Sequence, residues 1–357
     1  MQMVNGIEAE TQRSKDPAHV VHLTKWSVRV ALDIIGLAGM DFDFDTLRNP
    51  NNEYKELSEV YRNIMSRAPP PAFNWIGVLL NFVDHRVLYW LPEKRNSTLT
   101  RSFWSLRRQA GGIIDARKEK VVKDKTDDGR KDIIAMALRS GMFSTDMLLD
   151  HVMTSIAVGH ITTSITFDWC MYQLGLHPEW QTRLREEVRA MLPGGMENVD
   201  ASNIESLPWL NAVCSETLRF YPPLPLTTRV AVRDTKILST PVPKGTTMVY
   251  CADAINHDRT LWGPDAGIFD PERWMGPGRA ASGGATSNYA LLTFSAGPKN
   301  CIGQAWERAE LACLVAATIG RFQVEVINLD SAAFVEPVLT MMSKEGVYAR
   351  LKVVEGW

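Results

Sequence analysis

Residues 294–303 read Phe-Ser-Ala-Gly-Pro-Lys-Asn-Cys-Ile-Gly, and this stretch decides the fold of the chain. Its cysteine, Cys301, stands just before a segment with a helical pattern. The free N–H groups and the positive dipole end of a helix N-terminus favour a thiolate over a thiol. Gly297 and Gly303 let the backbone pass close to a flat ligand, because they carry no Cβ. Phe294 can pack beside the sulfur and keep water away.

A cysteine in this setting meets the requirements of a haem ligand. An axial thiolate pushes electron density onto the haem iron and favours cleavage of the O–O bond. A Cys-x-Gly taken alone would favour another interpretation, a buried cysteine beside a glycine turn. The four spaced residues together favour the haem ligand; they are Phe294, Gly297, Cys301 and Gly303.

Length and composition are those of an ordinary globular protein. The chain has 357 residues, of which 45% are hydrophobic and 22% charged, and its net charge of −2 indicates no nucleic-acid partner. The chain has 5 cysteines, an odd number, and no two of them have C-x-x-C spacing. Both facts argue against a disulfide framework or a zinc site. No apolar run reaches the roughly 18–20 residues that span a bilayer. The first ten residues lack a secretion signal.

The spacing of apolar residues predicts mainly helices, with strands confined to the second half of the chain. Helices are expected over 17–38, 51–66, 97–120, 145–176, 178–192, 207–220 and 305–319. Short strands are expected over 227–232, 236–238, 246–251, 322–327 and 346–354. The segment 72–90 is apolar and aromatic, and 120–131 is a charged linker.

The longest predicted helix, 145–176, has few polar residues and should run through the core. Gly159 and the hydroxyl-bearing residues between 162 and 166 weaken its middle. We therefore expect a local bulge or kink there, and such irregularities often mark functional sites.

Glu216 and Arg219 stand three residues apart on a predicted helix and so share one helix face. Taken alone, the pair would be interpreted as a surface ion pair of little energetic weight. It is followed by Tyr-Pro-Pro at 221–223 and, further on, by Pro-Glu-Arg-Trp at 271–274, which contains Arg273.

The order of these motifs resembles the cytochrome P450 family. Residues 294–303 are similar to that family's haem-ligand loop, Phe-x-x-Gly-x-Arg-x-Cys-x-Gly, with Lys299 in the place of the arginine. The resemblance implies that Cys301 is the axial ligand of the iron of haem b, within a loop shaped by Phe294 and the two glycines. Lysine offers a point charge where arginine offers a fork, so Lys299 would hold a haem propionate less specifically.

The resemblance also implies roles for the charged motifs. Glu216 and Arg219 match the family's Glu-x-x-Arg, and Arg273 matches its Pro-Glu-Arg. In the family, two arginines clamp the glutamate and lock the core around the haem loop, a structural role. Arg229 matches a position that often contacts a haem propionate, and a solvated strand arginine is the alternative. We interpret His257 as structural, because no second ligand stands near it at metal-site spacing.

The middle of the long helix, 158–164, resembles the family's Ala-Gly-x-(Asp/Glu)-Thr-(Thr/Ser). The resemblance implies that Thr162 is catalytic, because the family's threonine hydroxyl steadies bound dioxygen. Ile161 stands at the acid position, and an isoleucine cannot relay a proton. His160 is its neighbour, but adjacent helix positions point about 100° apart, so we expect it to face elsewhere. Two outcomes stay open, slow or uncoupled oxygen activation and chemistry without a proton relay.

The implied fold is a cytochrome P450 fold, mainly α with small β-sheets (α+β), in one catalytic domain over 1–357. Within it, 40–130 would supply substrate-lid helices, 144–177 the long central helix, and 290–320 the haem-ligand loop and the helix after it. The family's anchor helix, first sheet and Trp-x-x-x-Arg helix find no match, so a shortened or incomplete form is expected. The resemblance implies a location at the endoplasmic reticulum membrane. For a chain without an anchor, the expected location is the cytoplasm.

The implied function is insertion of one atom of O2 into a small apolar organic substrate, in fungal secondary metabolism. Electrons would come from NADPH through a separate reductase, because no nucleotide-binding glycine motif occurs in the sequence. Ile161 favours a second hypothesis, a haem-thiolate isomerase or dehydratase. The unmatched N-terminal region favours a third, a remnant without catalytic activity.

Overall fold

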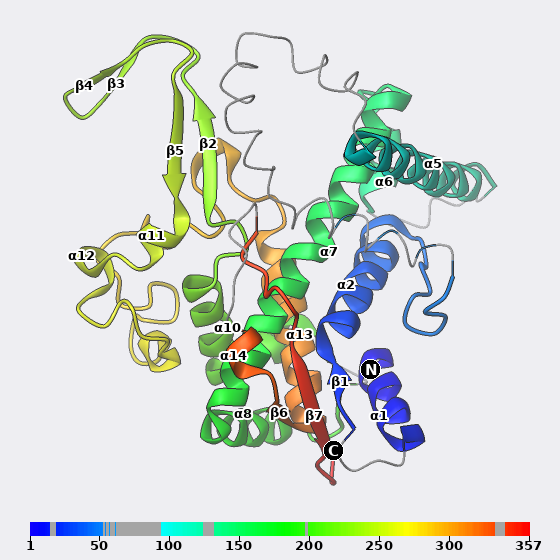
Figure 1. Cartoon of the computed structure of the whole chain (residues 1–357), viewed down its shortest axis with the longest axis vertical. Coiled ribbons are helices and arrows are strands. Elements are labelled where there is room, and N and C mark those ends of the chain that lie inside the picture. The colour runs from blue at the N-terminus through cyan, green and yellow to red at the C-terminus, as the bar shows by residue number, and fades with distance from the viewer. Residues whose placement is uncertain are drawn as a thin grey trace. The chain divides into compact units, whose positions relative to one another are not determined.

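The computed structural model describes residues 1–14, 19–52, 54, 57, 61, 94–123, 132–196, 199–332 and 340–357. In this part of the chain the protein is mainly helical with small antiparallel sheets, which confirms the expected fold class (Figure 1). The chain forms two compact units, one of Lys25–Ile161 and one of Met1–Thr24 with Thr162–Trp357.

The unit over Lys25–Ile161 is helical. Its helices are most of α2 (Leu23–Met40), α5 (Lys94–Lys123), α6 (Ile133–Ser140) and the first half of α7 (Thr145–Leu176). Arg117 of α5 is buried and donates to Asp132, which also caps α6 by accepting from the Ala135 N–H. This ion pair ties the end of one helix to the start of the next.

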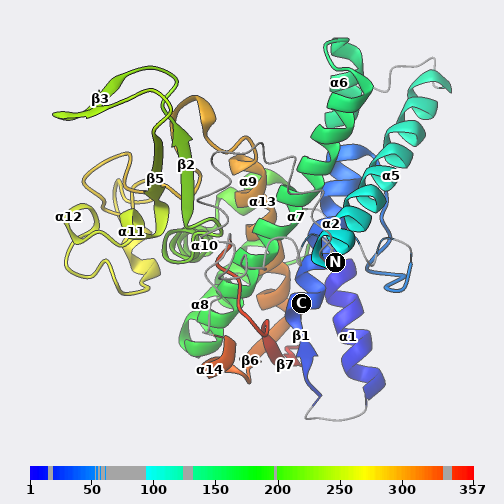
Figure 2. The ribbon, with the colours of Figure 1, turned by 45° about the horizontal axis from the view of Figure 1, so that its top comes forward.

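Helix α7 runs without interruption from Thr145 to Leu176, as Figure 2 shows, so the predicted bulge is wrong. Gly159 has a packing role instead. A Cβ on Gly159 would lie 2.9 Å from Cγ1 of Ile35, so glycine serves the close approach of α2.

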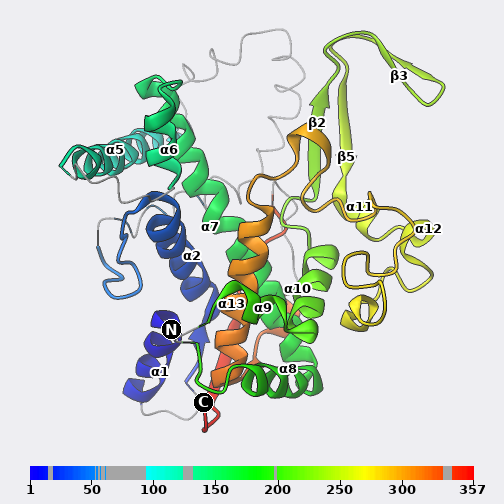
Figure 3. The ribbon, with the colours of Figure 1, turned by 180° about the vertical axis from the view of Figure 1, so that it is seen from behind.

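The other unit packs helices around α13. Its longer helices are α1 (Gln2–Ser14), the second half of α7, α8 (Pro178–Met191), α10 (Pro208–Phe220) and α13 (Gln304–Arg321). Helix α13 contacts α8 and α10, and the three lie together in the view from behind (Figure 3). The short helices are α9 (Ala201–Glu205), α11 (Ala252–Asn256), α12 (Arg259–Trp262), α14 (Leu329–Ala332), η2 (Pro271–Trp274) and η3 (Gly297–Lys299).

The sheets of this unit are small and antiparallel. One has the order β1-β7-β6, from Val21–His22, Tyr348–Val353 and Phe322–Val326. Alternate residues of β6 are buried, as expected for a strand with one face on the core. The pairs β2 (Leu226–Val230) with β5 (Thr247–Cys251), and β3 (Thr235–Ile237) with β4 (Thr240–Val242), form a ribbon that leads away from the helices (Figure 2).

Parts of the predicted organisation cannot be compared. The elements expected over 51–66 and 72–90 lie outside the described residues, apart from 51, 52, 54, 57 and 61. The same holds for residues 124–131 of the charged linker, and so for much of the region 40–130 assigned to lid helices. Within the described residues, no helix has both the length and the apolar character needed to cross a bilayer.

Candidate functional site

Cys301 lies in an exposed loop that links η3 to α13. Its N–H donates to the carbonyl of Phe294 at 2.8 Å, and this bond closes the loop. Phe294 is buried beneath, whereas every residue from 296 to 302 is exposed. Gly297 has a φ of 76°, in the left-handed region that favours glycine. The loop therefore presents the Cys301 thiol at the surface of its unit.

The electrostatics of this thiol differ from the sequence expectation. The pKa of Cys301 is raised, because partial burial outweighs the hydrogen bond from the Gly303 N–H and the Glu307 charge raises it further. The N–H at the start of α13 does favour the thiolate, as expected from the sequence, but burial outweighs this effect. A coordinated metal ion deprotonates such a thiol outright, so the thiolate would come from ligation.

Arg229 lies beside the same loop. Its Nη2 is 3.3 Å from Oγ of Ser295 and 3.4 Å from the Tyr250 hydroxyl, and these two oxygens lie 2.5 Å apart. Ser295 has a φ of 61°, an uncommon conformation for a residue other than glycine. Lys299 ends η3 and is exposed. Neither Tyr250 nor Ser295 was predicted from the sequence, because Tyr250 comes close to Arg229 through the pairing of β2 with β5 and Ser295 lies in a loop far along the chain.

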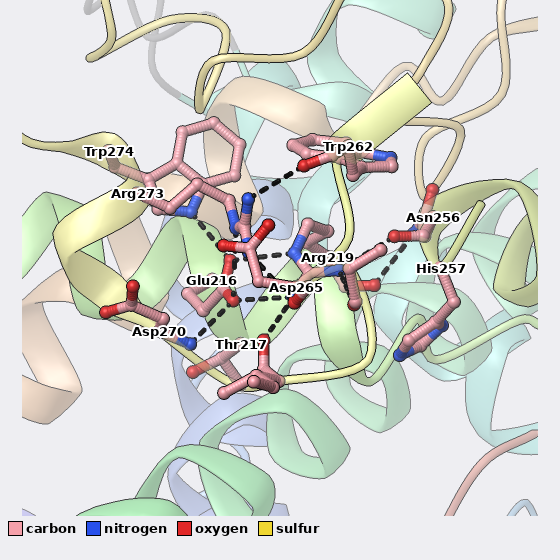
Figure 4. Close-up of polar contacts among 12 residues, drawn as sticks. Glu216, Thr217, Arg219, Asn256, His257, Trp262, Asp265, Asp270, Arg273 and Trp274 are labelled. Atoms are coloured by element: carbon pink, nitrogen blue, oxygen red, sulfur yellow. Dashed lines mark hydrogen bonds and ion pairs between the residues drawn. The ribbon is translucent and has the colours of Figure 1, made fainter. Parts of the chain in front are cut away.

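Glu216 is fully buried, and each of its carboxylate oxygens accepts two hydrogen bonds (Figure 4). Its two oxygens accept from Arg219 Nη2 at 2.6 Å and Nε at 2.8 Å. They also accept from the Asp270 N–H at 2.8 Å and from Trp274 Nε1 at 2.9 Å. The alternative of a surface ion pair is thereby excluded. Sequence analysis missed Asp270 and Trp274, although both flank the Pro-Glu-Arg motif.

Arg273 is close to this cluster but bonded elsewhere. Its Nε is 3.7 Å from Glu216 and has no hydrogen-bond partner among the described residues. Its Nη2 pairs with Asp265 at 2.8 Å, and its Nη1 donates to the Trp262 carbonyl. The structure thus brings the predicted residues together, with one arginine and one tryptophan bonded to Glu216.

Asn256 connects this cluster to the segment before the haem-ligand loop. Its Nδ2 donates to the Arg219 carbonyl and to Thr293 Oγ1, both at 2.9 Å, and its Oδ1 accepts from the Leu292 N–H. Thr293 and Leu292 directly precede Phe294 in the chain. The charged cluster therefore holds the start of the loop in place.

His257 follows Asn256, and its ring contacts a backbone carbonyl and an aromatic ring. Its Nδ1 lies 2.8 Å from the Asp253 carbonyl, and its ring packs edge-on against Phe220. Among the described residues there is no group of three or more side chains that could hold a metal ion.

The centre of α7 places Thr162 and His160 in different environments. Thr162 is half-buried, whereas Ile161 and His160 are buried. The His160 Nδ1 lies 2.5 Å from the Ile156 carbonyl, and its Nε2 has no hydrogen-bond partner among the described residues. Burial lowers the pKa of His160 to about 4, so the ring is neutral at pH 7. His160 is therefore no proton donor at neutral pH.

Two buried glutamates of α13 were not singled out from the sequence. Burial raises the pKa of Glu307 to about 7 and that of Glu310 to about 8. Glu307 Oε1 lies 3.1 Å from Thr166 Oγ1, and Glu310 Oε2 accepts from Trp306 Nε1 at 2.7 Å. Their signal in the sequence is acidic residues at core positions of an otherwise apolar helix face.

The residues around Cys301 fit a haem. A thiol exposed beside the buried ring of Phe294 can meet an iron, and a Cβ on Gly297 would point into open space. Ile302 is fully exposed and offers an apolar side chain. Arg229 supplies a cation at the edge of the loop, as haem carboxylates require.

Comparisons with known proteins agree with this geometry. The model of the family described as cytochrome P450 matches residues 2–348. The chain is 45% identical to cytochrome P450 monooxygenase FSL4 of Gibberella zeae, over the whole chain and 67% of that protein. It is 43% identical to cytochrome P450 monooxygenase sphH of Aspergillus fumigatus, over the whole chain and 66% of that protein. It is 35% identical to cytochrome P450 monooxygenase FUM15 of Gibberella moniliformis, over 90% of the chain and 60% of that protein.

The chain thus spans about two thirds of the length of the fungal relatives it matches. These relatives are named monooxygenases, which is the enzyme class that the sequence predicts.

Proposed function

Because this chain belongs to the cytochrome P450 family, we propose that it is a haem-thiolate monooxygenase that inserts one atom of O2 into an apolar organic substrate. The family expected from residues 294–303 is thereby confirmed. The observation that carries the proposal is the Cys301 thiol, exposed before α13 in a loop closed onto Phe294.

Cys301 would be the axial ligand, and Arg229 and Lys299 would hold the haem carboxylates. The haem, when bound, supplies oxygen binding and one-electron chemistry. Tyr250 and Ser295 keep the Arg229 guanidinium at the loop, 3.4 and 3.3 Å from their hydroxyl oxygens. A Cβ on Gly303 would lie 3.8 Å from the Cys301 sulfur, whereas a Cβ on Gly297 would meet no atom within 4 Å.

Glu216, Arg219 and Arg273 would act structurally. Glu216 fixes Arg219, and the Arg219 carbonyl fixes Asn256, which holds the backbone before Phe294. Through this chain of bonds the cluster sets where the Cys301 loop begins.

Thr162 would steady bound dioxygen with its hydroxyl. It is half-buried on a helix whose neighbouring residues, Ile161 and His160, are buried. Neither neighbour supplies a proton at pH 7, because isoleucine carries none and the His160 pKa is lowered to about 4. Electrons would come from NADPH through a separate reductase. Secondary metabolism would be the setting and haem b the cofactor; the relatives named cytochrome P450 monooxygenases are fungal.

The reduced, carbon-monoxide-bound spectrum of the purified chain tests the ligand. We expect a thiolate-type band that is lost in Cys301→Ala. The matched control is Cys313→Ala, which removes a half-buried thiol from α13 and should leave the band unchanged. A band that survives Cys301→Ala would remove Cys301 as the ligand.

A second candidate is a haem-thiolate isomerase or dehydratase, favoured by the isoleucine at the acid position. Product formation with and without O2 and reductase separates the two, since only the monooxygenase needs both. A remnant without catalytic activity would bind haem poorly or not at all, and it would form no product under either condition.

A further inference from the structure

Glu307 is a buried acid that none of the sequence motifs explains. It lies in the first turn of α13, with 7% of its surface exposed. Its Oε1 lies 3.1 Å from Oγ1 of Thr166, a fully buried residue of α7. Thr166 stands one helical turn after Thr162, the proposed catalytic residue. A carboxyl group of α13 is therefore linked to the turn of α7 that carries Thr162.

The hydrogens at Thr166 can be counted. Its hydroxyl has one hydrogen and lies 2.9 Å from the Thr162 carbonyl and 3.1 Å from Glu307. A carbonyl oxygen only accepts, so the hydroxyl must donate to it for that bond to exist. At 3.1 Å from Glu307, the Thr166 hydroxyl either shares its one hydrogen between the two acceptors or, when the carboxyl is protonated, accepts a hydrogen bond from it. Both bonds reach full strength only while Glu307 carries a proton.

Ionisation of Glu307 would rearrange these bonds. A carboxylate only accepts, so the Thr166 hydrogen would turn towards it and leave the Thr162 carbonyl. A threonine hydroxyl bonded to the carbonyl four residues before it bends a helix slightly. The protonation state of Glu307 therefore changes the helix geometry at Thr162.

The surroundings of Glu307 favour the proton. Burial raises its pKa to about 7, against the lowering effects of the Thr166 hydrogen bond and the Arg308 charge. A negative charge on Glu307 would raise the pKa of two other titratable groups, Cys301 and Glu310. Arg308 is the charged neighbour, and its Nη1 also lies 3.3 Å from Ser215 Oγ.

We propose that Glu307 is a positioning residue whose protonated carboxyl directs the Thr166 hydroxyl onto the Thr162 carbonyl and so fixes the turn that carries the Thr162 side chain. This inference rests on the proposed function, in which the Thr162 hydroxyl steadies dioxygen. The acidic side chain next to this turn of α7 then comes from α13, because α7 itself has Ile161 at the position where the family has an acid.

Infrared titration of the haem-loaded chain tests the proton directly, without turnover. We expect a protonated-carboxyl band that is lost with a midpoint near pH 7 and is absent from Glu307→Gln. In Thr166→Val the midpoint should rise, because the Thr166 hydroxyl stabilises the ionised carboxylate by donating to it and so lowers the pKa of Glu307. The matched control is Glu310→Gln, which removes a different carboxyl of α13 and should leave the band with the midpoint near pH 7. A midpoint that Thr166→Val leaves unmoved would overturn the proposal.

The coupling of NADPH consumption to product tests the positioning role. Glu307 passes from about one tenth to about nine tenths ionised between pH 6 and pH 8, so wild-type coupling should fall over this range. Glu307→Gln should lose the pH dependence and stay coupled, because an amide donates at every pH. The same pH dependence in Glu307→Gln as in wild type would refute the role. If no product forms at all, the monooxygenase proposal fails, and the infrared titration still decides where the proton lies.

Discussion

Glu216 and Glu307 are both buried glutamates of the same unit, and the structure provides for them differently. Glu216 accepts from an arginine, a tryptophan and a backbone N–H (Figure 4). Glu307 has one hydroxyl beside it, with Arg308 as a charged neighbour. Donors around a buried carboxylate compensate its burial, whereas burial with few donors favours the protonated form, and this raises the pKa of Glu307. The first arrangement builds a rigid core, and the second leaves a group that titrates.

The largest expected effect is that of Glu216→Ala. The Arg219 side chain would keep its carbonyl partners but lose its counter-charge in a fully buried position. Breaking a buried pair by removing one partner typically costs about 3–5 kcal/mol. Denaturant unfolding followed by circular dichroism measures this loss.

The matched control for Glu216→Ala is Glu272→Ala, which removes an exposed ion pair with Arg183. That change should cost at most about 1 kcal/mol. Equal losses in the two variants would contradict the contrast between a buried and an exposed pair.

Glu307→Gln should change how stability depends on pH. The folded-state pKa is raised from 4.5 to about 7, so the folded protein binds this proton more tightly than the unfolded chain does. Its contribution is complete below pH 4.5 and is lost as the pH rises to about 7. The loss amounts to about 3 kcal/mol, since a tenfold change in proton affinity is worth about 1.4 kcal/mol. Urea unfolding at a series of pH values should show this part of the decline only in wild type.

Glu310→Gln is the comparison for that experiment. It should retain the decline that ends near pH 7 and lose the part that extends towards pH 8, because the Glu310 pKa is about 8. A decline in Glu307→Gln identical to that of wild type would mean that Glu307 is ionised throughout.

Asn256→Ala should have a smaller effect on stability and a specific one on haem retention. It would leave buried donors and acceptors around Arg219 and Leu292 unpaired, at a cost of about 1–3 kcal/mol. Because Asn256 ties the Glu216 cluster to the start of the loop, haem should also leave faster. Transfer of haem to an acceptor protein measures that rate.

Asn211→Ala is the matched control for the loop. Asn211 is half-buried and its Nδ2 donates to the carbonyls of Ile204 and Leu207, at the start of α10. It should lose stability without losing haem faster. Equal haem loss in both variants would show that the effect comes from general loosening of the unit.

Much of the fold could be predicted from local pattern. The apolar run from 145 to 176 coincides with α7, because the apolar pattern that predicts the helix lies within the segment itself. The helix expected over 207–220 coincides with α10 to within one residue. The expected bulge in α7 was wrong, since Gly159 meets Ile35, a residue far away in the sequence.

The candidate site likewise has residues that local spacing predicts and residues that only packing brings together. Cys301, Gly297 and Phe294 stand within one short loop, so their spacing alone predicts that they act together. Tyr250 reaches Ser295 across 45 positions, and Glu307 reaches Thr166 across 141. No spacing rule covers such distances, because they depend on how strands pair and helices pack.

By itself, the sequence determined the class of fold and the pairing of Glu216 with Arg219, and it indicated Cys301 as the proposed iron ligand. These features depend on residues a few positions apart, whose relative geometry a helix or a loop already sets. Only the tertiary structure decided that Arg273 bonds mainly to Asp265, that His160 is buried and its pKa lowered, and that burial beside Thr166 raises the pKa of Glu307. Burial and hydrogen-bond supply control these outcomes, and both are properties of packing between distant segments.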